Sequence, residues 1–174
     1  MKNCVRNWIW RAPTLGVFKA KSVYELRLIQ EMMSRAKREI PECECFKMQL
    51  IDNLRKNFIS YGLVRLTTVR EECAIGYALW NYYGQGNMSV KQASKWNEDV
   101  ALRQIAIFPS FQRKGYGKKL LEICLKDLNV NHFTVESPDD AFLDFLIKHG
   151  YAHREATEKE IAIKGDRVSF FFEG

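Results

Sequence analysis

Apolar residues recur at helical spacing in four segments of the chain. The first begins at Ser22, where Glu25 three residues later completes the signature of a helix N-terminus, and Pro41 ends it. Ser137, followed by a proline and two acids, marks the start of the last helix, and Gly150 marks its end. The four predicted helices cover 22–40, about 46–58, a stretch from a glycine-bearing loop to about 128, and 138–149.

Strands are predicted where β-branched, aromatic and other apolar residues alternate or run together between turn residues. Two such runs flank the charged turn at 70–72 and would form an antiparallel hairpin. A third run is apolar on both faces apart from Arg103 and Gln104, as expected of a strand at the centre of a sheet. The predicted strands are 63–69, 74–83, 100–108, 132–136, 161–163 and 168–172, the last two joined by a Gly-Asp turn.

The predicted order is two helices, three strands, a helix, a strand, a helix and two strands, which describes a mixed α/β sheet. No Ser/Gly-rich linker, low-complexity tract or internal repeat divides the chain. Its 174 residues match the usual length of one domain. We therefore expect a single domain over 1–174, in which a basic and aromatic segment (1–21) precedes the fold core (22–174).

The composition excludes several classes of protein. Hydrophobic residues make up 47% of the chain and aromatic residues 13%, enough for a packed core, so a disordered or fibrous chain is excluded. No window approaches about 18 consecutive apolar residues, the length that spans a membrane. The first residues lack the apolar stretch of a signal peptide, and the five cysteines form no disulfide framework. These observations predict a cytoplasmic protein with reduced thiols and no membrane association.

Positive charge is concentrated in two stretches. Residues 1–40 carry nine Lys or Arg against three Glu, whereas the charges of the rest of the chain cancel. A terminal basic excess is typical of a solvated face, and we favour that interpretation over a nucleic-acid site, which stays an alternative. The second stretch, 103–119, holds five basic residues and no acid, and it coincides with a glycine-containing loop.

That loop, at 112–118 (Gln-Arg-Lys-Gly-Tyr-Gly-Lys), links a predicted buried strand to a predicted helix. Gly115 and Gly117 allow a sharp turn and present backbone N–H groups with no Cβ in the way. The helix N-terminus adds its positive end, so the loop suits a pyrophosphate. It lacks the span and the Lys-Ser/Thr ending of a Walker A loop, and the third glycine of a dinucleotide fingerprint. The alternative is an ordinary strand-to-helix turn rich in Gly and Lys.

The stretch from Ile107 to Gly117 closely resembles motif A of the GNAT acetyltransferases, whose core is Q/R-x-x-G-x-G/A after a strand and a proline. The run at 74–79 is a frequent GNAT sequence type, and the predicted element order agrees with that family. The resemblance implies the GNAT fold, an α/β architecture with a mixed central sheet and helices on both faces. It also implies acetyl-CoA as acyl donor without a metal, its pantetheine arm on the strand backbone and its pyrophosphate on the loop amides. The cofactor-binding residues implied in this way are Ile105, Ala106, Ile107, Gln112, Arg113, Lys114, Gly115, Tyr116, Gly117 and Lys118.

A carboxylate at the end of the next predicted strand is the candidate general base. An amine is protonated at neutral pH and must lose a proton before it attacks a thioester. Glu136 ends the strand after motif A, at the edge where open α/β sheets bind ligands. Over about 100–151 the sequence resembles the type B histone acetyltransferases, with V-E-S-P where they have V-E-D-P. This resemblance implies Glu136 as catalytic base and Asp139 as a further contact to CoA; the alternative is a strand-end carboxylate that caps the next helix.

Two departures from these families concern other roles in the reaction. The second acid of V-E-D-P is Ser137 here, which fits a helix N-cap better than a nucleophile. Leu146 stands where many GNATs have the tyrosine that protonates the leaving thiolate. Tyr116, Tyr151 or solvent would take that role instead.

The expected activity is transfer of an acetyl group from acetyl-CoA to a primary amine of a protein or small molecule, with a glutamate as general base. Two alternatives stay open. One is acyl transfer to a nucleobase amine, favoured by the basic first forty residues. The other is a non-catalytic acetyl-CoA-binding module, favoured by the missing tyrosine. No metal is expected, because Cys43-Glu44-Cys45 has no second ligand pair.

Overall fold

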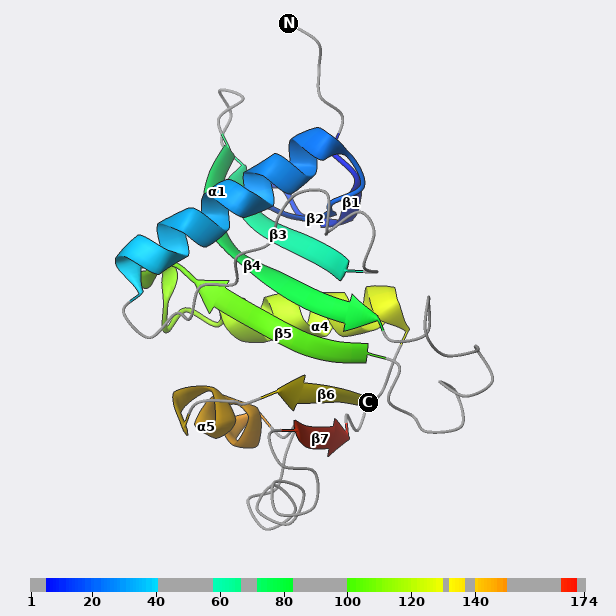
Figure 1. Ribbon diagram of the computed structural model, residues 1–174. Helices are drawn as coiled ribbons and strands as arrows, with labels where there is room; N and C mark the ends of the chain where they lie inside the picture. Colours follow the sequence, from blue (N-terminus) through cyan, green and yellow to red (C-terminus); the bar gives the residue numbers. More distant parts are fainter. Residues whose placement is uncertain are drawn as a thin grey trace, which may run out of the picture. The chain divides into compact units, whose positions relative to one another are not determined.

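The computed structural model describes residues 6–40, 58–66, 72–82, 100–129, 132–136, 140–149 and 167–171. Within these ranges the chain forms strands, α-helices and one 3₁₀ turn (Figure 1). The strands are β1 (Trp8–Arg11), β2 (Leu15–Lys19), β3 (Phe58–Leu66), β4 (Glu72–Tyr82), β5 (Val100–Ile107), β6 (His132–Glu136) and β7 (Arg167–Phe171). The helices are α1 (Val23–Glu39), α4 (Tyr116–Leu128) and α5 (Asp140–Lys148), and the 3₁₀ turn is η1 (Pro109–Phe111).

The chain divides into two compact units, residues 1–79 with 104–127 and residues 80–103 with 128–174. In the first unit the strands lie in the order β1-β2-β3-β4-β5, and both β1/β2 and β2/β3 are antiparallel. In the second unit the order is β4-β5-β6-β7, with β5 and β6 parallel and β6 and β7 antiparallel. The mixed sheet is confirmed, whereas the single domain over 1–174 stays a prediction.

Helix α1 begins as its sequence predicts. The Ser22 side chain accepts a hydrogen bond from the N–H of Glu25 (3.1 Å), and the Ser22 hydroxyl lies 3.2 Å from Glu25 Oε1. The buried carboxylate of Glu25 also accepts from the N–H groups of Asn7 (3.0 Å) and Lys21 (3.2 Å). One glutamate therefore satisfies donors of the chain that precedes the helix, which is the function of a capping box.

In the first unit, α1 and α4 cover opposite faces of the sheet (Figure 1). Neighbouring residues of a strand point to opposite faces. Phe18 of β2 packs with side chains of α1, whereas the next residue, Lys19, reaches Asp127 of α4. Helices on both faces, which the resemblance implied, are therefore present. The core on the α1 face consists of Phe18, Ile29, Met32, Met33, Ala36, Val64, Tyr77, Leu79, Ala106 and Phe108.

The sequence analysis predicted no strand before residue 22, but the structure has two. Neither β1 nor β2 shows a period of two in its hydrophobic residues; β2 pairs with β3, and β1 pairs with β2. Gly16 of β2 lies opposite Val64 of β3, and a Cβ at Gly16 would be 2.3 Å from the indole ring of Trp8. The Trp8 ring of β1 therefore occupies the space that a side chain at Gly16 would need.

Strand β3 begins earlier in the sequence than predicted. It begins at Phe58, where the prediction had the end of a helix over 46–58; residues 46–57 lie outside the described residues. The predicted strand began at Leu63 and left out Gly62, which lies inside β3. A glycine fits at this position because the ring of Phe18 lies 2.4 Å from where a Cβ would be, which leaves no room for a side chain. The predicted strand at 161–163 lies outside the described residues, and the other elements agree within a few residues.

Candidate active site

The end of β5 is fixed from two sides. The N–H of Phe108 donates to the carbonyl of Ile75 in β4 (2.9 Å), and the Phe108 ring is fully buried. The guanidinium of Arg35 in α1 lies 4.1 Å from the centre of that ring. The carbonyl of Phe108 then accepts from the N–H of Phe111 (2.9 Å), which closes η1. The strand that the resemblance assigns to pantetheine therefore ends at a rigid position; Ala106 is buried there, and Ile105 and Ile107 are half-buried.

The loop after η1 has two residues in left-handed backbone conformation. Arg113 has φ +62° and Gly115 has φ +83°. The side-chain amide of Gln112 donates to the carbonyl of Ile107 (2.9 Å) and ties the loop back to the strand end. Residues 112–115 are exposed, and a Cβ at Gly115 would meet no atom within 4 Å. A left-handed arginine is strained, and such strain is found where a loop holds a ligand-binding shape.

Helix α4 begins with backbone donors that have no acceptor inside the helix. The carbonyl of Gly115 accepts from the N–H of Lys119 (3.1 Å), so Gly115 is the residue before the helix, and it has no side chain to cap it. The N–H groups of Tyr116, Gly117 and Lys118 have no acceptor within the helix geometry. The first turn contains no acid. Such a terminus attracts an anion through its N–H groups and its dipole, as a pyrophosphate site requires.

The two lysines of this turn have different neighbours. Lys118 Nζ lies 3.9 Å from Glu122 Oε1, in an exposed pair. Lys119 Nζ lies 4.8 Å from the ring centre of Trp10, in β1. No carboxylate in the described part of the chain pairs with Lys119. The sequence analysis assigned positive charge here but not the aromatic contact.

Glu136 is the last residue of β6, as predicted. In the second unit β6 runs parallel to β5, with Thr134 opposite Ala101, and antiparallel to β7, with Glu136 opposite Arg167. Glu136 therefore stands at the carboxyl end of a strand, while its role as base stays a prediction. Asp139 and Ser137 lie outside the described residues.

The position of the family's tyrosine is part of the core. Leu146 lies in α5 and is fully buried. Of the alternatives for protonating the thiolate, Tyr116 is half-buried with its ring edge-on to Phe111 at 6.3 Å, and Tyr151 lies outside the described residues.

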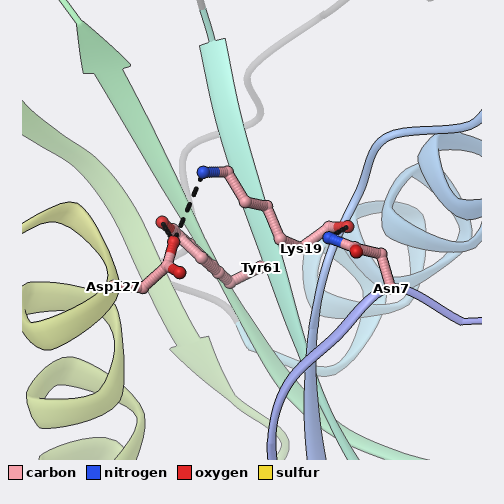
Figure 2. Close-up of polar contacts among 4 residues, drawn as sticks. All are labelled: Asn7, Lys19, Tyr61 and Asp127. Atoms are coloured by element: carbon pink, nitrogen blue, oxygen red, sulfur yellow. Dashed lines mark hydrogen bonds and ion pairs between the residues drawn. The ribbon is translucent and has the colours of Figure 1, made fainter.

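A polar cluster at the other end of α4 was not predicted. The Tyr61 hydroxyl of β3 donates to Asp127 Oδ2 (2.6 Å), and Lys19 Nζ of β2 lies 3.3 Å from the same oxygen (Figure 2). The Asn7 side chain donates to the carbonyl of Lys19 (3.3 Å). Asp127 is in the last turn of α4, where the helix dipole disfavours a carboxylate, so the lysine and the phenol offset that cost. The cluster ties the end of α4 to two strands.

Burial raises the pKa of Tyr61, and the hydrogen bond to Asp127 acts in the same direction. Above about pH 10 the unfolded chain loses the phenol proton while the folded chain retains it, so stability should fall as pH rises. Tyr61→Phe should cost about 1–3 kcal/mol at neutral pH and should remove part of this alkaline decline. Urea unfolding between pH 7 and 10.5 measures both effects. Tyr24→Phe, at a tyrosine 47% exposed, is the control; equal declines in all three proteins would contradict the assignment.

Neither a metal centre nor a membrane helix is found in the described ranges. No group of three His, Cys, Asp or Glu side chains there is placed to hold a metal ion. Cys43 and Cys45 lie outside these ranges. No helix within them is both long and apolar enough to cross a membrane.

Comparison with solved structures supports the fold. The ribosomal-protein-S18-alanine N-acetyltransferase from Escherichia coli superposes with a TM-score of 0.51 at 14% identity, covering 79% of this chain and 77% of that one. A tyrosine-to-phenylalanine variant of KacT superposes with a TM-score of 0.50 at 14% identity, covering 91% and 95%. At these identities the likeness concerns the fold alone.

Sequence comparison identifies the family. The histone acetyltransferase type B catalytic subunit of Kluyveromyces lactis is 32% identical over 72 residues, which are 39% of this chain and 18% of that protein. The chain thus matches less than a fifth of that relative's length. The family model described as "Acetyltransferase (GNAT) family" matches residues 22–151, most of the chain. The protein therefore belongs to the GNAT family of acetyltransferases.

Proposed function

We propose that the protein transfers an acetyl group from acetyl-CoA to a primary amine of a protein or small molecule, with Glu136 as general base. The observation that carries the donor half of this proposal is the uncapped, acid-free N-terminus of α4, preceded by an exposed loop with left-handed Arg113 and Gly115. Members of this family use acetyl-CoA as acyl donor, and these features suit its pyrophosphate.

Each part of the donor has candidate partners in the first unit. The backbone of Ile105–Ile107 would pair with the pantetheine arm as an added strand does. The N–H groups between Gln112 and Lys118 would hold the pyrophosphate, and Arg113 and Lys114 add exposed positive charge. Asp139 is proposed as a further contact. No metal takes part in this assignment.

The acetyl group would move directly from sulfur to nitrogen. Glu136 would accept a proton from the ammonium, directly or through a water, so that the amine lone pair is free to attack the thioester carbon. A backbone N–H of β5 would stabilise the oxygen that becomes negative in the tetrahedral transition state. The attacking nitrogen then loses its second proton to solvent, the C–S bond breaks, and Tyr116, Tyr151 or solvent gives a proton to the thiolate.

The basic N-terminal region bears on the nucleobase alternative. Not all of its cations are free to meet a nucleic acid, since Lys19 pairs with Asp127, and Arg35 pairs with Glu39 and packs on Phe108. This favours a protein or small-molecule amine over a nucleobase. Thiol release from acetyl-CoA in the presence of candidate acceptors separates an enzyme from a binding module. Labelled acetyl-CoA in the native lysate would identify the acceptor.

Replacing Gly115 with valine tests the donor site. The substitution forces a β-branched residue to φ +83° and places its side chain in the open space over the loop, so acetyl-CoA affinity should fall by at least about tenfold. Acetyl-CoA stabilises the native state by about 2.7 kcal/mol at a concentration of 100 Kd, and a tenfold loss of affinity would roughly halve this. Thermal unfolding with and without acetyl-CoA measures the difference.

Ser110→Ala is the matched control, because Ser110 is exposed in η1 and outside the proposed donor site. It should retain the full ligand-induced shift. If the valine variant also retains it, the loop does not bind the donor and the proposal fails.

A further inference from the structure

The N-terminal strands contact both ends of α4. Trp10 of β1 lies over Lys119 in the first turn, and Lys19 of β2 pairs with Asp127 in the last turn. Both strands precede residue 22, where the match to the family begins. The contacts are made within one compact unit. The segment outside the family match therefore reaches the helix whose N-terminus we assign to acetyl-CoA.

A β-bulge determines which tryptophan reaches α4. In a regular strand, residues two apart point to the same face, so Trp8 and Trp10 would share one. The register shifts between them, with Trp8 opposite Phe18 and Trp10 opposite Val17. Trp8 accordingly packs edge-on to Phe18 at 6.3 Å, whereas Trp10 is directed to α4. The extra residue of a bulge re-aims a side chain in this way.

We propose that Trp10 is a positioning residue for acetyl-CoA binding and that it acts through Lys119. The inference rests on the proposed function. The negative face of the indole attracts the ammonium and covers part of it from water. It also restricts a side chain that would otherwise sample many rotamers. Trp10 thereby holds in place a positive charge that belongs to the first turn of α4.

Lys119, which Trp10 contacts, differs from Lys118 in its nearby charges. Lys118 has Glu122 beside it, so its field is partly cancelled. Lys119 has no carboxylate partner in the described part of the chain, and an indole carries no net charge. Lys119 therefore adds its full charge to the potential that attracts the phosphates of the donor.

The test is the equilibrium Kd for acetyl-CoA, measured by calorimetry on Trp10→Ala, Trp10→Phe, Lys119→Met and the Trp10→Ala/Lys119→Met double variant. Trp10→Ala should raise Kd by roughly three- to tenfold, and Trp10→Phe by less, because a phenyl face still attracts the ammonium. Lys119→Met should raise Kd at least as much, and adding Trp10→Ala to it should change little. The difference between wild type and Trp10→Ala should shrink at high salt, which a purely structural loss would not do.

Trp8→Ala is the matched control, since it removes the same side chain from the same strand on the opposite face. It should lower the melting temperature and leave Kd unchanged. If Trp10→Ala does not fold, Trp10→Phe and the surface variant Lys119→Met carry the test. If the wild type binds acetyl-CoA but Trp10→Ala or Lys119→Met has an unchanged or lower Kd, the role of Trp10 is wrong and the proposed function still stands. Absence of acetyl-CoA binding by the wild type would instead overturn the proposed function.

Discussion

Turnover should fall by about 10²–10⁴-fold when Glu136 is replaced by glutamine, the range expected for loss of a general base. Glutamine keeps the size of the side chain but accepts no proton, so acetyl-CoA should bind about as tightly as before. The wild-type rate should rise with pH, because the base must be ionised and the amine must lose a proton. The variant should lack or shift that rise. Thiol release measured across the pH range, with an identified acceptor, gives both quantities.

Glu31→Gln is the control for this substitution, because Glu31 is exposed on α1 and has no assigned role. It should retain wild-type turnover. Near-normal turnover of Glu136→Gln across the pH range would leave Glu136 as a strand-end carboxylate. Glu98 and Asp99, before β5, would then be tested as the base.

Gly76→Ala should destabilise the protein by about 1–3 kcal/mol, as overpacking of a filled site does. A Cβ at Gly76 would lie 2.3 Å from the carbonyl oxygen of Ala106 and 2.7 Å from Ile107 Cδ1. Backbone atoms of β5 must therefore move, and they belong to the strand proposed for pantetheine. For a chain of this size we expect a fall in melting temperature of roughly 2–12 °C, together with weaker acetyl-CoA binding.

A second glycine gives the contrast for this prediction. Gly115→Ala adds the same methyl group where a Cβ meets nothing within 4 Å, so its cost comes only from the positive φ. That cost is about 1–2 kcal/mol and involves no movement of β5. If Gly76→Ala melts like the wild type, β4 and β5 do not approach as closely as described.

Several features could be predicted from the sequence because they depend on residues a few positions apart. The capping box of Ser22 and Glu25 is formed by hydrogen bonds within one helical turn. In the loop at 112–118, Gly115 has a left-handed backbone, as glycine allows, whereas Gly117 lies in α4. The strand ending at Glu136 is bounded by a local pattern of apolar and turn residues. In each case the side chains that decide the conformation are neighbours in the chain.

Other features involve residues more than forty positions apart, and no local pattern indicates them. Gly62 lies inside β3 opposite Phe18 of β2, whose ring occupies the space that a side chain at Gly62 would need. The Tyr61 hydroxyl meets Asp127 across 66 positions. These contacts form only when the strands are paired. The residues next to either partner in the sequence therefore do not indicate them.

The sequence by itself indicated the family resemblance, the candidate phosphate-binding loop and the candidate base, because each depends on a short run of neighbouring residues, and it indicated the mixed α/β class through the order of such runs. The tertiary structure decided that residues 8–11 and 15–19 are strands, since neither segment has a period of two, β2 pairs with β3 and β1 pairs with β2. It also decided, through the bulge between Trp8 and Trp10, which indole faces α4. A one-residue change of register reverses the face of every later side chain, and register is fixed by packing against the rest of the sheet.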